Sequence, residues 1–298
     1  MQRNISIDVL KLILSFFVIG LHISLLEDFD ANLGFILNQG IFRIAVPVFL
    51  VINGYYFSNI NDWEKYKKWI KRVFFLYLFW MFFYLPFWVS KDITKNFIYV
   101  FNGYFHLWYI IGLIYASFLL FLLRRINPHI HIILSFKLYS IGTLLQYLHS
   151  FGGFTIETFV YRNFLFFCLP FLMIGFLIKK FENEKKLNNV FYVFILLFFS
   201  ELSIDLYLSG GKAIFDLLFT LLLICPVIFI LVKKKILLRN NKNIGLVSSA
   251  IYFIHPSVLF ILRKFYGLYS INEFLVVLLG SIFLTIPLLY LNKKLRIL

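Results

Sequence analysis

Ten apolar stretches follow one another along this 298-residue chain, each close to the length that a helix needs to cross a bilayer. About 20 apolar helical residues span the hydrocarbon core. Because 61% of the residues are hydrophobic and only 14% are charged, a water-soluble fold of this size could not bury them. The sequence predicts an all-α, polytopic transmembrane bundle that forms a single membrane domain over residues 1–298. The ten expected spans cover residues 9–26, 35–57, 73–89, 104–123, 130–148, 159–178, 190–208, 213–232, 244–262 and 273–291.

Basic residues alternate between the segments that join these spans. With the N-terminus inside the cell, twenty Lys and Arg residues fall in inner segments and only five in outer loops. Inner loops of membrane proteins are rich in Lys and Arg, so both termini are expected in the cytoplasm. This bias also accounts for the net charge of +15, and a nucleic-acid partner is not expected. No cleavable signal peptide is expected, because no small-residue cleavage site follows the first apolar stretch.

Several ionisable side chains fall inside the expected spans, where charge is costly and usually marks a functional cavity, and four of them are singled out by their depth. His22 lies 14 positions after Asp8, or about 21 Å along the first helix. Arg43 enters from outside and lies about 12 Å below the outer edge of the second span. His106 opens the fourth span from the same side, and His255 lies late in the ninth. The pattern predicts that the four collect in the outer half of the bilayer.

Each of these residues also has a structural interpretation. His106 could be an interfacial residue in an aromatic belt with Trp108 and Tyr109. A buried arginine needs acceptors, so Arg43 could form an ion pair with Asp216, or it could bind an anionic ligand. No metal site is expected, because Cys168 and Cys225, the only cysteines, lie far apart in apolar runs.

Four short motifs contain these residues, in one order along nearly the whole chain. They are Lys11 and His22 with ten positions between them, Arg43 followed by Asn53-Gly54-Tyr55, His106-Leu107-Trp108-Tyr109, and Ile251 to Pro256 around His255. The chain thereby resembles the acyltransferase-3 superfamily, and in particular the O-acetyltransferases of bacterial surface polysaccharides, of the enterobacterial common antigen type. It departs from that pattern with Lys at position 11 and at positions 68 and 71, where Arg is usual, and with Asn53 in place of Ser.

The resemblance implies a membrane O-acyltransferase of the bacterial cytoplasmic (inner) membrane. Its donor substrate would be cytoplasmic acyl-CoA, and acetyl is the commoner acyl group in the family. Its acceptor would be a hydroxyl of a surface polysaccharide or of a lipid-linked oligosaccharide precursor, although peptidoglycan, lipopolysaccharide and small metabolites stay open. Histidine is the natural base near neutral pH, which suits His22, and Arg43 or His106 could polarise the acyl carbonyl. The expected contacts of acyl-CoA are Lys11, Lys68, Lys71 and Arg72, and the further candidates are Asp8, Asn53, Trp108, Tyr109 and His255.

A transporter or flippase for a lipid-linked or anionic sugar is the alternative function. Arg43 and the histidines would then form a binding cluster in the membrane. Transporters of this kind use pairs of Gly- or Pro-broken spans, and the hydropathy pattern predicts no such pair.

Overall fold

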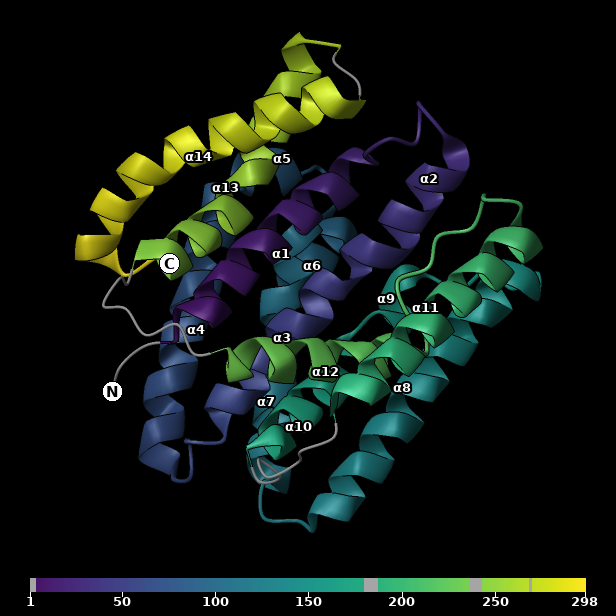
Figure 1. Cartoon of the computed structure of the whole chain (residues 1–298). Helices are drawn as coiled ribbons and strands as arrows, with labels where there is room; N and C mark the ends of the chain where they lie inside the picture. Colours follow the sequence, from purple (N-terminus) through teal and green to yellow (C-terminus); the bar gives the residue numbers. More distant parts are fainter. Residues whose placement is uncertain (1–3, 180–186, 236–242, 268–269) are drawn as a thin grey trace. The chain divides into compact units, whose positions relative to one another are not determined.

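The computed structural model describes residues 4–179, 187–235, 243–267 and 270–298, and these residues fold into helices (Figure 1). No strand occurs among them, which confirms the all-α prediction. Arg3 and the basic segments within 180–186 and 236–242, which entered the predicted orientation, lie outside the described residues. The chain divides into two compact units, and each is described by itself.

Six helical segments in the described part of the chain are long and apolar enough to cross a membrane. They are Ile5–Ile23, Ala31–Phe57, Phe105–Leu123, Val190–Ser209, Asn243–Phe265 and Ser270–Leu295. All six fall on expected spans. The other four expected spans fall on helices that are shorter or more polar: α4 (Trp63–Phe83), α8 (Pro128–Phe151), the apolar pair η4 (Phe164–Cys168) and α10 (Leu169–Ile178), and α12 (Leu221–Lys234). Ten spans and cytoplasmic termini stay predictions.

The first unit comprises residues 1–46, 188–214 and 227–298. Three long helices, α1 (Ile5–Ile23), α13 (Asn243–Phe265) and α14 (Ser270–Leu295), pack side by side in it (Figure 1). Their common core contains Ile19, Ile251, Leu259 and Val277, all essentially inaccessible. The other helices of this unit are α2 (Ala31–Phe35), the π-helix η1 (Ile36–Gly40), the 3-10 helix η2 (Ile41–Ile44), α11 (Leu187–Ser209) and the last part of α12 (Leu221–Lys234).

Hydrogen bonds at the two ends of α1 show that α1 and α13 run in the same direction. At its start, the Asn4 side chain donates to the Lys233 carbonyl at 2.9 Å, and the Ser6 hydroxyl donates to the Lys235 carbonyl. Beyond its other end, the Leu26 amide donates to the Ser270 hydroxyl at 3.1 Å. Because α13 runs from one of these anchor points to the other, residues near the ends of α1 and α13 share one end of the unit.

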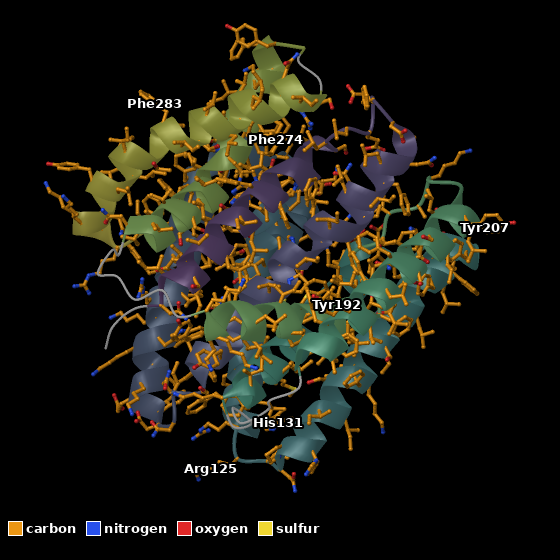
Figure 2. All side chains as sticks on the ribbon, in the orientation of Figure 1. Arg125, His131, Tyr192, Tyr207, Phe274 and Phe283 are labelled. Carbon is orange, nitrogen blue, oxygen red and sulfur yellow. The ribbon has the colours of Figure 1, made fainter. Side chains whose placement is uncertain are left out.

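Aromatic side chains cover the outside of this unit. Tyr207 is 86% exposed and Tyr192 is 71% exposed on α11, and Phe283 is 70% exposed on α14. Figure 2 shows Tyr207 and Phe283 at the edge of the view, pointing away from the ribbon. A water-soluble protein rarely exposes so many large apolar groups, whereas lipid chains solvate them. The surface therefore supports the prediction of a membrane protein.

The second unit comprises residues 47–187 and 215–226. It depends on very close helix contacts, as at Gly54 in α3, where a Cβ atom would lie 2.1 Å from the Leu172 carbonyl oxygen of α10. Small residues allow such backbone approach in membrane bundles. Its helices are α3 (Ala45–Phe57), α4 (Trp63–Phe83), α5 (Leu85–Trp88), α6 (Ile93–Asn102), η3 (Phe105–Leu107), α7 (Trp108–Leu123), α8 (Pro128–Phe151), α9 (Thr158–Tyr161), η4 (Phe164–Cys168), α10 (Leu169–Ile178) and the first part of α12 (Leu221–Lys234).

The expected span 213–232 is wrong over its first eight residues, because α12 begins only at Leu221. The Gln146 side chain takes the place of the missing helical bonds: its carbonyl oxygen accepts from the amides of Asp216 and Leu217 at 2.7 and 2.9 Å. Its amide group donates back to the Leu217 carbonyl at 2.8 Å. Non-helical backbone is tolerated at membrane depth where protein groups pair with it. Interrupted helices thus occur here and around Gly40, contrary to the prediction from hydropathy.

Candidate functional site

Two histidines face each other between α1 and α13 in the first unit. The rings of His22 and His255 stack with centroids 5.4 Å apart and planes 21° from parallel. His255 is fully buried, and its Nδ1 lies 3.2 Å from the Ile251 carbonyl oxygen one turn earlier. Since a carbonyl oxygen only accepts, this hydrogen bond requires a proton on Nδ1. His22 is only partly buried, so it is the member of the pair that a substrate can reach.

Lys11 occupies the same face of α1 as His22. Eleven residues correspond to about three turns and about 16 Å of helix, so the two side chains are nearly aligned along the axis. Lys11 is partly exposed, and Asp8 is buried in the first turn of the same helix. Lys11 and His22 therefore face the same side of α1, while contact of Lys11 with an acyl-CoA donor stays a prediction.

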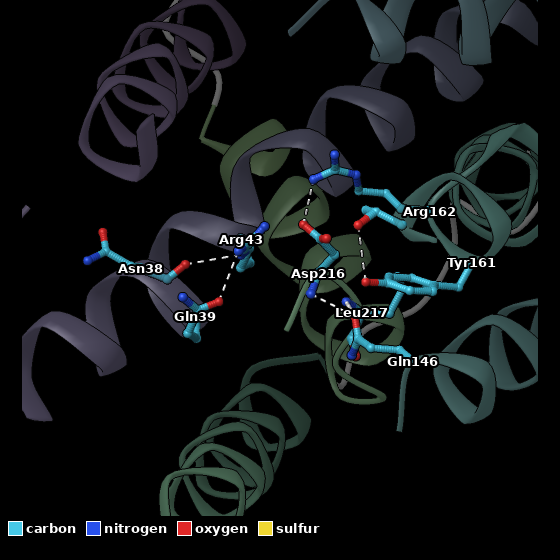
Figure 3. Close-up of polar contacts among 9 residues, drawn as sticks. Asn38, Gln39, Arg43, Gln146, Tyr161, Arg162, Asp216 and Leu217 are labelled. Carbon is cyan, nitrogen blue, oxygen red and sulfur yellow. Dashed lines mark hydrogen bonds and ion pairs between the residues drawn. The ribbon is translucent and has the colours of Figure 1, made fainter. Parts of the chain in front are cut away.

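Arg43 lies where the second apolar segment departs from α-helical geometry. It belongs to the 3-10 helix η2, directly after the π-helix η1. Irregular turns of this kind release backbone carbonyls and are frequent at functional sites. The Arg43 Nε donates to the Asn38 carbonyl at 3.0 Å, and one terminal nitrogen donates to the Gln39 side chain at 2.9 Å (Figure 3).

The depth of Arg43 matches that of His22. Its neighbour Phe42 packs on α1 at Gly20, where a Cβ atom would lie 2.6 Å from the phenyl ring. Gly20 comes two residues before His22, so η2 meets α1 at the level of the histidine pair. The structure therefore brings His22, His255 and Arg43 to one level of the first unit, while their place in the outer half of the bilayer, together with His106, stays a prediction.

The other predicted residues gather in the second unit. His106 lies in η3 with only 1% of its surface exposed, and its ring meets Tyr84 edge-on at 5.3 Å. It is thus buried and not a surface member of an aromatic belt. Asn53 of α3 donates to the Tyr109 hydroxyl at 2.7 Å and to the Phe49 carbonyl at 2.9 Å. The participation of His106 in a common site with His22 stays a prediction.

The predicted acyl-CoA contacts on α4 are exposed. Lys68, Lys71 and Arg72 lie on the outside of the first half of this helix. Asp62 caps the helix by accepting from the Lys65 amide at 2.7 Å, and this bond, together with the Lys65 ammonium, lowers the pKa of the Asp62 carboxyl. The cap fixes where the basic segment begins. Its binding to acyl-CoA stays a prediction.

Two ion pairs were missed by the sequence reasoning. In the second unit, Arg162 pairs with Asp216 at 2.8 Å (Figure 3) and its guanidinium lies 4.9 Å from the centre of the Trp108 ring. In the first unit, Arg263 holds Glu273 at 2.7 Å. Arg162 and Asp216 lie in two different expected spans, and Arg263 lies in an expected outer loop. Only the opposite charges of the partners could have suggested either pair from the sequence. The possible ion pair of Arg43 with Asp216 stays a prediction.

Comparison with known proteins connects these sites to one family. The profile of the acyltransferase domain, acyltransferase-3, matches residues 4–291. An amino-acid racemase of Enterococcus faecalis is 26% identical over 99% of this chain and 47% of its own length. A serine/alanine racemase of Enterococcus gallinarum is 27% identical over 86% of this chain and 41% of its own. The chain thus spans less than half the length of these curated relatives, and no solved structure matches it.

The extent of the family match decides the assignment. The match covers nearly the whole chain and includes every candidate site residue named above, from Asp8 to His255. The racemase names belong to longer proteins, of which this chain matches only a part. The chain therefore belongs to the acyltransferase-3 family.

Proposed function

We propose that this protein is a membrane-embedded O-acyltransferase of the bacterial cytoplasmic membrane. It takes an acyl group, in the first instance acetyl, from cytoplasmic acyl-CoA and transfers it to a hydroxyl of a surface polysaccharide or of its lipid-linked precursor. The observation that carries the proposal is the stacked pair of His22 and His255 on two span-length helices of an acyltransferase-3 domain.

The transfer needs a base and a positive charge. The acceptor oxygen attacks the thioester carbonyl and forms the new C–O bond, while His22 takes the hydroxyl proton. The C–S bond then breaks, and the thiolate of coenzyme A leaves with the proton returned by His22. Arg43, at the same level of the unit, supports the negative charge that develops on the carbonyl oxygen. His255 packs against the His22 ring and limits its orientations, which makes it a positioning residue.

The donor has to reach this level from the cytoplasm. Acyl-CoA is polyanionic, so basic side chains suit its phosphates, and we assign this part to Lys68, Lys71 and Arg72 on α4. Lys11, aligned with His22 along α1, lies on the path that the pantetheine arm would follow. Asn53, Tyr109 and Trp108 supply hydrogen-bonding groups in the second unit.

The experiment compares cells that carry wild-type protein with cells that carry His22→Ala. Loss of a general base lowers the rate by about 10²–10⁴-fold. Mass spectrometry of the envelope glycans should show the acyl group missing while the amount of exported glycan is unchanged. Failure of export, with acylation intact on the retained precursors, would contradict the proposal.

A transporter or flippase for a lipid-linked or anionic sugar is the second candidate. One observation favours it: the helices are interrupted around Gly40 and over residues 213–220. It predicts the opposite outcome of the same experiment, because His22→Ala would then reduce export and leave the chemistry of the glycan unchanged.

A further inference from the structure

A cavity of about 570 Å³ opens at one end of the first unit. Its walls come from three places: the residues that follow α1, the last turn of α13 with Tyr266, and the first turn of α14. A volume of this size accommodates a small-molecule group such as one or two sugar rings. None of its lining residues was among the candidates predicted from the sequence.

The shape of the cavity is held by cross-links between its walls. Arg263 of α13 donates from two nitrogens to the two carboxylate oxygens of Glu273 in α14, at 2.7 and 3.1 Å. The Ser270 hydroxyl accepts from the Leu26 amide at 3.1 Å, which ties the loop after α1 to α14. A bidentate pair fixes both position and orientation, so the walls are preorganised.

The cavity adjoins the histidine pair. Ile23 and Ser24, which directly follow His22, line it. A terminal nitrogen of Arg263 lies 3.5 Å from the His22 carbonyl oxygen, so the ion pair borders the last turn of α1. This end of α1 is opposite the end bound to Lys233, which belongs to a basic segment of the cytoplasmic side in the predicted orientation. The cavity thus opens outward in that orientation.

The charges of the lining are unequal. Glu27, Asp28 and Glu273 contribute three carboxylates, while Arg263 contributes one guanidinium. Glu273 is buried and neutralises the charge of Arg263 in their ion pair. The two exposed carboxylates of Glu27 and Asp28 therefore determine the net charge at the rim of the cavity. A negative rim repels carboxylate and phosphate groups and attracts ammonium groups. Hydroxyls of Ser24, Tyr266 and Ser270 add partners for a polyhydroxylated ligand.

We infer that this cavity binds the acceptor and selects it by charge. The ligand class is a polyhydroxylated ring that is neutral or carries an amino group, and a ring that carries a carboxylate or phosphate is rejected. The inference rests on the proposed function for the transfer step. It adds where the acceptor binds and which acceptors are excluded.

Binding to the purified full-length protein tests the inference without any transfer. The probes are methyl glucoside, methyl glucosaminide and methyl glucuronide, followed by saturation-transfer NMR. The neutral and amino glycosides should bind, and the glucuronide should bind about tenfold more weakly, as expected for nearby unit charges partly screened by water. Glu27→Gln with Asp28→Asn should remove most of that difference, whereas Glu157→Gln, a charge change outside the cavity, should preserve it. Equal binding of the three glycosides, binding of none, or no effect of the double substitution would overturn the assignment.

A transfer assay separates failure of this inference from failure of the proposed function. If wild-type protein acylates glycosides but the double variant keeps the same preference among them, the acceptor binds elsewhere and the cavity assignment is wrong. If the glycosides bind with the expected preference but none is acylated from acyl-CoA, the cavity assignment holds and the proposed function fails.

Discussion

Buried polar side chains serve two different purposes in the two units. In the second unit, Gln146 bonds to backbone groups of a segment that has left the helix, and Arg162 pairs with Asp216 of that same segment. In the first unit, His22 and His255 lie on α1 and α13, which stay helical through both positions although Pro256 of α13 has no amide proton to donate. The first set bonds a segment that has left the helix, whereas the two histidine rings stack between two segments that remain helical. Burial of a polar group in a membrane bundle therefore does not by itself indicate function.

Gln146→Leu should have the largest effect on stability. It leaves two backbone amides and one carbonyl of residues 216–217 without their partner in an apolar interior, at about 1–3 kcal/mol for each group and about 3–9 kcal/mol in all. The measurement is thermal unfolding in detergent, with Lys137→Leu on an exposed part of α8 as the control. An unchanged Tm would show that the hydrogen bonds of Gln146 do not stabilise the fold, and would contradict the role given to them above.

Asp216→Asn should have an intermediate effect. The Asp216 side chain is buried, but that of Arg162 is 31% exposed, so solvent screens part of the lost interaction. We expect a loss of about 1–3 kcal/mol in the free energy of unfolding. Adding Arg162→Met should recover part of the loss, since the second substitution removes the remaining charge. No recovery in the double variant would show that the pair does not act as a unit.

His255→Phe should have the smallest effect on stability and a clear effect on transfer. A ring of similar size keeps the contact with His22, and the change in packing costs less than about 1.5 kcal/mol. Loss of the bond from Nδ1 to Ile251 loosens the pair, and a positioning role predicts a lower kcat, by about tenfold, with little change in KM. A large fall in Tm with unchanged kcat would assign His255 to the fold instead.

Features that depend only on the position of a residue along a helix could be predicted from the sequence. The all-α class followed from the apolar runs, and the common level of His22, His255 and Arg43 followed from residue counts at 1.5 Å per residue. Pairings across helices depend on which way each helix is turned, and residue counts do not contain that information. The bonds of Gln146 and the pairing of Arg263 with Glu273 therefore came only from the structure.

Helix interruption was the other feature that hydropathy did not predict. Residues 213–220 are as apolar as a span requires, yet Asp216 and Gln146 together give the backbone an alternative to the helix. The residues that form the cavity were missed for a similar reason, because Glu27, Asp28 and Arg263 have the composition of an ordinary outer loop. Their convergence is a property of tertiary structure.

Purified protein in vesicles, with acetyl-CoA enclosed and methyl glucosaminide outside, tests the central claim most directly. The measurement compares transfer by wild type, by His22→Gln and by His129→Gln, which changes an exposed histidine of α8. The account predicts that His22→Gln loses about 10²–10⁴-fold in transfer rate while its Tm and that of His129→Gln match wild type. Transfer by His22→Gln at the wild-type rate would contradict it.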